Sequence, residues 1–229
     1  MTIRRDLRRL NEAGRIRLVH GGVYATGRQQ EVSAFDQRRQ HHQAAKSAIG
    51  RAAAGLVAPQ DSIAIDAGST TLEVLEHLPE NFGGTIVSHS LPVLFAAQLR
   101  QRFRAVGLGG DLLRESCAFV GPSSVEMASS LRVRIFFLGA AAIDSRGIYV
   151  AADIERPTKT ALMDAADQVV LLADHSKFRS SAPVLLCKLN RLDTLVTDLP
   201  VLPAITKTLH QSGVKLVITG ESEEKGFFL

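Results

Sequence analysis

SIAIDAGSTT, residues 62–71, is the stretch that decides the fold of this chain. The apolar run 63–65 predicts a short buried strand, the turn after it contains Gly68, and a helix is predicted over 70–77. The same order of strand, turn and helix recurs further along the chain. Strands that alternate with helices are typical of a largely parallel sheet with helices on both faces. The sequence therefore predicts an α/β fold, whereas the order of the strands is not readable from it.

Six further strands and four further helices are predicted downstream by the same pattern. The strands are expected at 85–87, 104–108, 133–138, 169–173, 194–196 and 215–218, and the helices at 91–102, 125–131, 158–166 and 202–211. Upstream, apolar residues at three- and four-residue spacing predict one helix over 35–57, after a polar linker at 26–33. We expect three parts: residues 1–25, a linker and connecting helix at 26–57, and an α/β domain at 58–229.

The first 25 residues have a different character. A helix predicted over 2–13 separates four arginines from three aliphatic residues on its two faces, namely Arg4, Arg5, Arg8 and Arg9 from Ile3, Leu7 and Leu10. Gly14 is expected to end this helix, and residues 15–25 predict strand, tight turn and strand. A basic helix followed by a basic hairpin is typical of the second half of a winged helix-turn-helix module. The alternative is an ordinary solvated basic helix.

Charge is distributed unevenly along the chain. Residues 1–60 hold 11 Lys and Arg against 4 Asp and Glu, whereas residues 61–229 hold 16 against 19. A basic N-terminal segment on a mildly acidic body favours binding of a polyanion by that segment. DNA contacts are accordingly expected at Thr2, Arg4, Arg5, Arg8, Arg9, Arg17 and His20.

Several classes of protein are excluded by composition. Two cysteines, Cys117 and Cys187, are too few for a disulfide-rich secreted scaffold, and neither has a neighbour at zinc-ligand spacing. No apolar run approaches the ~20 residues that span a membrane, so we expect a cytoplasmic protein without a membrane partner. No motif indicates a metal, a cofactor or a catalytic nucleophile.

The turns that follow the predicted strands are the candidate ligand sites, because ligands of parallel α/β sheets bind at the carboxyl ends of strands. Asp66-Ala67-Gly68-Ser69-Thr70-Thr71 places a glycine and hydroxyls at the start of a helix, which favours an anion such as phosphate. A plain strand-to-helix turn with Ser or Thr capping explains the same residues equally well. Further candidate turns are 107–110, 139–144, 153–159 and 174–177, of which the last two carry Lys159 and Lys177.

Together these segments resemble the DeoR family of bacterial transcriptional regulators. The resemblance runs in order from Met1 to about Asp198. Thr2-Ile3-Arg4-Arg5-Asp6-Leu7 and Val19-His20-Gly21-Gly22 are similar to the family's recognition helix and wing. Asp66-Ala67-Gly68-Ser69-Thr70, Leu108-Gly109-Gly110, Val120-Gly121-Pro122, Phe137-Leu138-Gly139-Ala140, Ile143-Asp144 and Leu172-Ala173-Asp174-His175-Ser176-Lys177-Phe178 are similar to landmarks of its sensor domain.

The resemblance implies a repressor with a winged helix-turn-helix and a sensor domain similar in fold to ribose-5-phosphate isomerase. It implies operator DNA and a phosphorylated sugar or related metabolite as partners, in a homodimer or homotetramer. Matched residue by residue, it places ligand contacts at Asp66, Gly68, Ser69, Thr70, Thr71, Gly139, Asp144, Glu155, Lys159 and Lys177. The 68–71 loop would take the phosphate, and Lys159 and Asp144 would face the sugar.

Two departures from the family pattern bear on these expectations. The family has two helices before the segment that begins here at Met1, which indicates a partial winged helix-turn-helix from a truncated or mis-started reading frame. A sensor-only protein without DNA binding is the alternative. After Asp144 the family usually has Gly-Leu-Thr-Thr, whereas this chain has Gly147-Ile148-Tyr149-Val150 and lacks both threonine hydroxyls.

A sugar-phosphate isomerase is the rival interpretation. Isomerisation needs a carboxylate base within hydrogen-bond reach of a sugar carbon's proton. The isomerase pattern after the fourth predicted strand is Gly-Ala-Asp-Glu, whereas this chain has Gly139-Ala140-Ala141-Ala142. A phosphate site without the acid pair favours binding without turnover, and we expect a regulator and not an enzyme.

Overall fold

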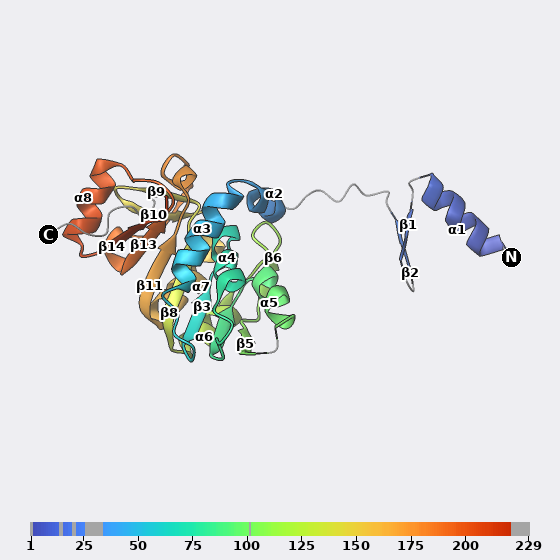
Figure 1. Ribbon diagram of the computed structural model, residues 1–229, viewed down its shortest axis with the longest axis horizontal. Coiled ribbons are helices and arrows are strands. Elements are labelled where there is room, and N and C mark those ends of the chain that lie inside the picture. Colours follow the sequence, from blue (N-terminus) through green and yellow to red (C-terminus); the bar gives the residue numbers. More distant parts are fainter. Residues whose placement is uncertain (1, 14–15, 20–21, 26–33, 101, 221–229) are drawn as a thin grey trace. The chain divides into compact units, whose positions relative to one another are not determined.

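The chain forms two compact units, Met1–Ser33 and Ala34–Leu229. The computed structural model describes residues 2–13, 16–19, 22–25, 34–100 and 102–220 (Figure 1). The smaller unit holds helix α1 (Thr2–Glu12) and a hairpin of strands β1 (Ile16–Val19) and β2 (Gly22–Ala25), in which Val19 pairs with Gly22. These are the basic helix and the hairpin that the sequence predicts.

The larger unit is built on a seven-stranded sheet in which every neighbouring pair is parallel (Figure 1). Its order is β14-β13-β11-β8-β3-β4-β5. The strands are β3 (Ser62–Ile65), β4 (Thr85–Ser88), β5 (Arg104–Gly107), β8 (Val133–Gly139), β11 (Ala166–Leu172), β13 (Thr194–Thr197) and β14 (Lys215–Ile218). All seven lie where the sequence predicts strands, so the expected parallel α/β class is confirmed.

Helices cover both faces of this sheet because successive strand residues point to opposite sides. On one face Ile65 and Phe137 pack with residues of α2 (Ala34–Gln40), α3 (Gln43–Ala54), α4 (Ser69–His77) and α5 (Leu91–Gln98). On the other face Phe136 and Leu138 pack with residues of α6 (Pro122–Ser129), α7 (Arg156–Asp164) and α8 (Pro203–Gln211). Phe136 and Phe137 are fully buried in the two separate cores.

The single helix predicted over 35–57 is instead two helices, α2 and α3. His42 adopts the left-handed conformation at φ 55° and ψ 37°, which a continuous α-helix does not allow. Phe35 is buried in the core, so α2 packs against the sheet's helical layer and does not extend away from it. The larger compact unit thus begins at Ala34, whereas the sequence assigned residues up to 57 to a connecting segment.

Small antiparallel pieces, which the sequence analysis did not predict, complete the larger unit. Strands β6 (Asp111–Leu113) and β7 (Ala118–Val120) pair with each other. Strands β9 (Ala142–Asp144), β10 (Gly147–Val150) and β12 (Val184–Cys187) form a sheet of order β12-β10-β9. Strands β6, β9 and β10 lie within or beside the candidate ligand turns of the sequence, and no helical pattern between β6 and β7 or between β9 and β10 indicated a further parallel strand. Within the described residues, no helix is long and apolar enough to cross a membrane.

Candidate functional site

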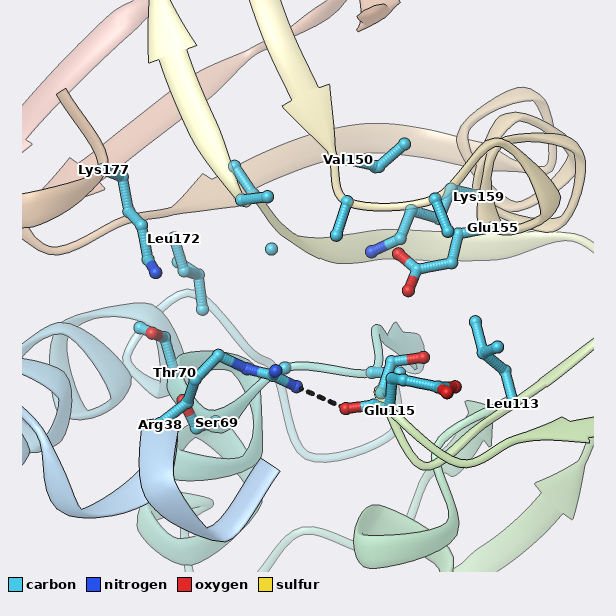
Figure 2. A pocket seen from close by; sticks show the side chains of 18 residues that line it. Arg38, Ser69, Thr70, Leu113, Glu115, Val150, Glu155, Lys159, Leu172 and Lys177 are labelled. Atoms are coloured by element: carbon cyan, nitrogen blue, oxygen red, sulfur yellow. Dashed lines mark hydrogen bonds between the residues drawn. The ribbon is translucent and has the colours of Figure 1, made fainter. Parts of the chain in front are cut away.

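A cavity of about 280 Å³ opens at the carboxyl ends of strands β3, β8 and β11 (Figure 2). The parallel strands bring their following turns together there, as expected for this class of sheet. Helix α2, the loop between β6 and β7 and the start of α7 complete its wall. The lining residues are Arg38, Ala67, Gly68, Ser69, Thr70, Leu113, Glu115, Ser116, Gly139, Ala140, Ala141, Val150, Ala151, Ala152, Glu155, Lys159, Leu172 and Lys177.

Asp66 lies fully buried beneath the cavity and bonds to two of its lining residues, Lys159 and Gly139. One carboxylate oxygen accepts hydrogen bonds from Lys159 Nζ at 2.5 Å and from the Gly139 N–H at 2.8 Å. The other oxygen lies 2.8 Å from His89 Nε2. Burial by itself would raise the pKa of Asp66, but the Lys159 ammonium and the His89 ring outweigh it and hold that pKa well below its usual range. Asp66 is therefore a buried anion that positions the cavity's lining residues.

The N-terminus of α4 points its first turn into the cavity. Gly68 precedes the helix in extended conformation, and no side chain caps the helix. The first N–H groups of an α-helix have no partner within the helix and carry partial positive charge. Ser69 and Thr70 line the cavity there, both nearly buried, and their hydroxyls bond to no other described residue. Such a helix start can bind an anion such as phosphate.

Thr71, the third hydroxyl of this segment, has a different role. Its Oγ1 donates to the carbonyl oxygens of Asp66 and Gly68 at 2.7 Å and 3.0 Å. The hydroxyl thus stabilises the turn between β3 and α4. Thr71 does not line the cavity, although it is fully buried directly behind it.

Three cationic side chains line the cavity, and they differ in how they are paired. Lys159 is nearly buried and forms its ion pair with Asp66. Lys177 and Arg38 are half-buried, and neither lies within 4 Å of a carboxylate of the described residues. Figure 2 shows the Lys177 ammonium directed toward Thr70. Both cations lie beside the uncapped helix start, where an anion is favoured, although the Asp174 carboxylate interacts electrostatically with Lys177 and Glu115 also lines the cavity.

Seven of the ten ligand contacts expected from the sequence line the cavity: Gly68, Ser69, Thr70, Gly139, Glu155, Lys159 and Lys177. Asp66 and Thr71 lie directly behind the lining. Asp144 does not line the cavity, because its carboxylate accepts hydrogen bonds from the N–H groups of Arg146 and Gly147 and from the Tyr149 hydroxyl. Asp144 therefore closes the turn between β9 and β10.

Part of the cavity wall comes from distant segments that were not predicted from the sequence. Arg38 belongs to a helix that the sequence assigned to the connector, and no local pattern marks it as a site residue. Leu113 ends strand β6, and Glu115 and Ser116 belong to the loop between β6 and β7, which follows no strand of the main sheet. Only the folded arrangement brings these residues to the strand ends. Among the described residues, no cluster of His, Cys, Asp or Glu could hold a metal ion.

The expected DNA-contact residues are described only in part. Arg5, Arg8 and Arg9 are exposed on α1, whereas Leu7 and Leu10 are half-buried. His20 lies outside the described residues, as do the side chains of Thr2, Arg4 and Arg17. The two-faced character of α1 thus holds for the side chains that the structure describes.

Each of the two compact units matches a known protein family. Residues 1–29 match the DeoR-like helix-turn-helix domain, and residues 41–199 match the DeoR C-terminal sensor domain. A DNA-binding segment joined to a sensor domain defines a transcriptional regulator. The chain belongs to the DeoR family.

Several relatives that are named as transcriptional regulators are similar to this chain over nearly its whole length. The HTH-type transcriptional repressor GlcR of Bacillus subtilis is 30% identical over 98% of this chain and 86% of its own. The uncharacterized HTH-type transcriptional regulator YgbI of Escherichia coli is 31% identical over 95% and 86%. The HTH-type transcriptional regulator GlpR of Haloferax volcanii is 32% identical over 94% and 85%. Family membership therefore places the chain among regulators and not among enzymes.

Solved structures similar to this chain include ribose 5-phosphate isomerase A from Neisseria gonorrhoeae, with 18% identity and a TM-score of 0.43. That match covers 59% of this chain and 53% of the isomerase. The eIF2B beta structure from Chaetomium thermophilum matches 67% of this chain and 50% of its own, with 15% identity and a TM-score of 0.46. At this level of identity the similarity concerns the fold.

Proposed function

We propose that the protein is a transcriptional repressor whose cavity binds a phosphorylated sugar. The observation that carries this proposal is the uncapped start of α4, where Ser69 and Thr70 present buried hydroxyls to the cavity beside Lys177. Backbone N–H groups, hydroxyls and an ammonium together fit the oxygens of a phosphate monoester.

The rest of the cavity suits the sugar part of such a ligand. The side chains of Leu113, Val150 and Leu172 offer apolar surface for the carbon skeleton. Glu155, only 8% exposed, and Lys159 lie close together in Figure 2, across the cavity from Ser69. A carboxylate accepts hydrogen bonds from sugar hydroxyls, and backbone groups of the wall can donate to them. The volume of about 280 Å³ restricts the ligand to a small metabolite.

Effector binding can be measured by thermal shift with phosphorylated sugars, each paired with its unphosphorylated parent. A ligand at 100 times its Kd stabilises the folded protein by about 2.7 kcal/mol. At about 2–4 °C per kcal/mol for a domain of this size, Tm should rise by about 5–11 °C. We expect the rise only with phosphorylated members of the panel.

A matched pair of serine substitutions tests where the phosphate binds. Ser69→Ala removes a hydroxyl at the start of α4, and Ser123→Ala removes an exposed one in the first turn of α6. Ser69→Ala should weaken binding of the active sugar phosphate about tenfold, as for one lost hydrogen bond to a charged group. Equal binding by both variants, or equal shifts with phosphorylated and parent sugars, would contradict this site. If the protein isomerised a sugar phosphate and Glu155→Ala abolished that activity, the proposal that it is a regulator would be contradicted.

The DNA side of the proposal concerns α1. We propose that Thr2, Arg4, Arg5, Arg8, Arg9, Arg17 and His20 contact operator DNA in the cytoplasm, as a homodimer or homotetramer reading a symmetric site. An effector changes operator affinity if it favours one placement of the DNA-binding units over another. Arg5→Ala should weaken binding to operator DNA selected from a random pool. A uniform loss across sequences indicates phosphate contact, and a loss at one base position indicates base contact. Unchanged operator affinity on effector saturation would contradict the coupling.

A further inference from the structure

Arg38 is the one residue of helix α2 that lines the cavity. One of its terminal N–H groups donates to the backbone carbonyl of Glu115 at 3.2 Å, as Figure 2 shows. A guanidinium carries five N–H donors, so most of its hydrogen-bonding capacity remains available. Within the described part of the chain, no carboxylate forms an ion pair with it at 4 Å or less, although the acids Glu115 and Glu155 line the same cavity.

The β6–β7 loop, whose Glu115 carbonyl accepts the hydrogen bond from Arg38, also contains a hydroxyl without a hydrogen-bond partner. Ser116 is 7% exposed and lines the same cavity, and its buried Oγ has no hydrogen-bond partner. Leaving a buried hydroxyl without a hydrogen-bond partner is unfavourable. The next residue, Cys117, has a left-handed φ of 53°, an uncommon conformation that is found preferentially at functional sites.

Contacts near both ends of helix α2 hold it in place, and with it Arg38. Phe35 anchors the first turn in the core with 3% exposure. The Lys46 ammonium, itself 3% exposed, donates to the carbonyl of Arg38 near the end of the helix. Burial lowers the pKa of Lys46, and the nearby Asp174 carboxylate opposes that change. Because the larger unit begins at Ala34, α2 is also the first element after the linker from the DNA-binding unit.

We propose that Arg38 binds the phosphate of the effector together with Ser69, Thr70 and Lys177, and so couples occupancy of the cavity to α2. This inference rests on the proposed function. A planar guanidinium can hold two phosphate oxygens at once, which an ammonium cannot. Contact with the bound phosphate transfers the position of the ligand to the helix that leads to the DNA-binding unit.

Binding tests use inorganic phosphate and glucose 6-phosphate as probes, with Arg38→Gln, Arg38→Lys and the control Arg39→Gln. Arg39 is the exposed next residue of the same helix and does not line the cavity. Arg38→Gln should raise the Kd of both probes about tenfold, since charge-assisted hydrogen bonds are lost. Arg38→Lys should recover part of the affinity because its charge remains without the fork. Arg39→Gln should bind as the wild type does.

Hydrogen exchange separates coupling from simple loss of affinity. At saturating probe, the amides of residues 34–40 should gain protection in the wild type and in Arg39→Gln. Arg38→Gln should lose this gain while residues 69–77 keep theirs. The role of Arg38 is contradicted if Arg38→Gln and Arg39→Gln have equal Kd values, or if Arg38→Gln retains the protection of α2. Neither outcome contradicts the proposed function. A wild type that binds neither these probes nor any phosphorylated sugar of the panel overturns the proposed function as well.

Discussion

Asp66→Asn should be far more destabilising than its small change in shape suggests. The substitution keeps the side chain's size but removes the negative charge that the buried Lys159 ammonium faces. Removing one partner of a buried ion pair leaves an uncompensated charge and is unfavourable by about 3–5 kcal/mol. At about 2–4 °C per kcal/mol, Tm should fall by about 6–20 °C.

The effect has a defined pH dependence. The pKa of Asp66 is lower in the folded protein than in the unfolded chain, where it is about 3.9. The unfolded chain therefore takes up a proton first as the pH falls, and the stabilisation by the carboxylate is lost below about pH 4. The difference in free energy of unfolding between wild type and Asp66→Asn should be constant from pH 5 to 7 and should shrink below about pH 4.

Urea unfolding followed by far-ultraviolet circular dichroism measures these free energies. Asp167→Asn is the matched control, because Asp167 pairs with Arg132 at the surface, where 82% of the arginine side chain is exposed. That control should change stability by less than about 1 kcal/mol. Adding Lys159→Met to Asp66→Asn should restore much of the loss, since the unpaired cation is then gone. A loss below about 1 kcal/mol for Asp66→Asn, or no recovery in the double variant, would refute the reasoning.

Two further predictions concern packing and thiol chemistry. Gly50→Ala would place a Cβ 2.3 Å from the Cβ of Glu73, where α3 meets α4, so Tm should fall by several degrees. Gly109→Ala, with open space around it, should leave Tm unchanged. Differential scanning fluorimetry measures both. Burial raises the pKa of Cys187 to about 11, so Ellman's reagent should react slowly with this thiol at pH 8 and faster toward pH 11. Fast reaction at pH 8 in a Cys117→Ala background would contradict that pKa.

The main sheet could be predicted because each strand is a short apolar run closed by turn residues. Phe136 and Phe137 show why such runs identify buried parallel strands, since one faces each core. The place of the cavity followed without the strand order, because the carboxyl ends of parallel strands lie at one edge in any order. The break at His42 was not predicted because the spacing of apolar residues runs past it, whereas its ring packs edge-on against the distant His175, a contact that only the fold creates. Arg38 was missed for the same reason.

Asp66 shows where sequence reasoning reaches its limit at the site itself. An acid that follows a buried strand in an α/β chain is expected to contact the ligand, and nothing in the local sequence opposes that interpretation. In the structure both of its oxygens are used by the protein, through Lys159, Gly139 and His89. Gly139 and Lys159 come from the end of β8 and from α7, so a single carboxylate fixes two lining segments of the cavity, and His89, in the turn after β4, holds that carboxylate from outside the lining. Loss of effector binding in an Asp66 variant would therefore reflect displaced walls, and it would not by itself identify Asp66 as a ligand contact.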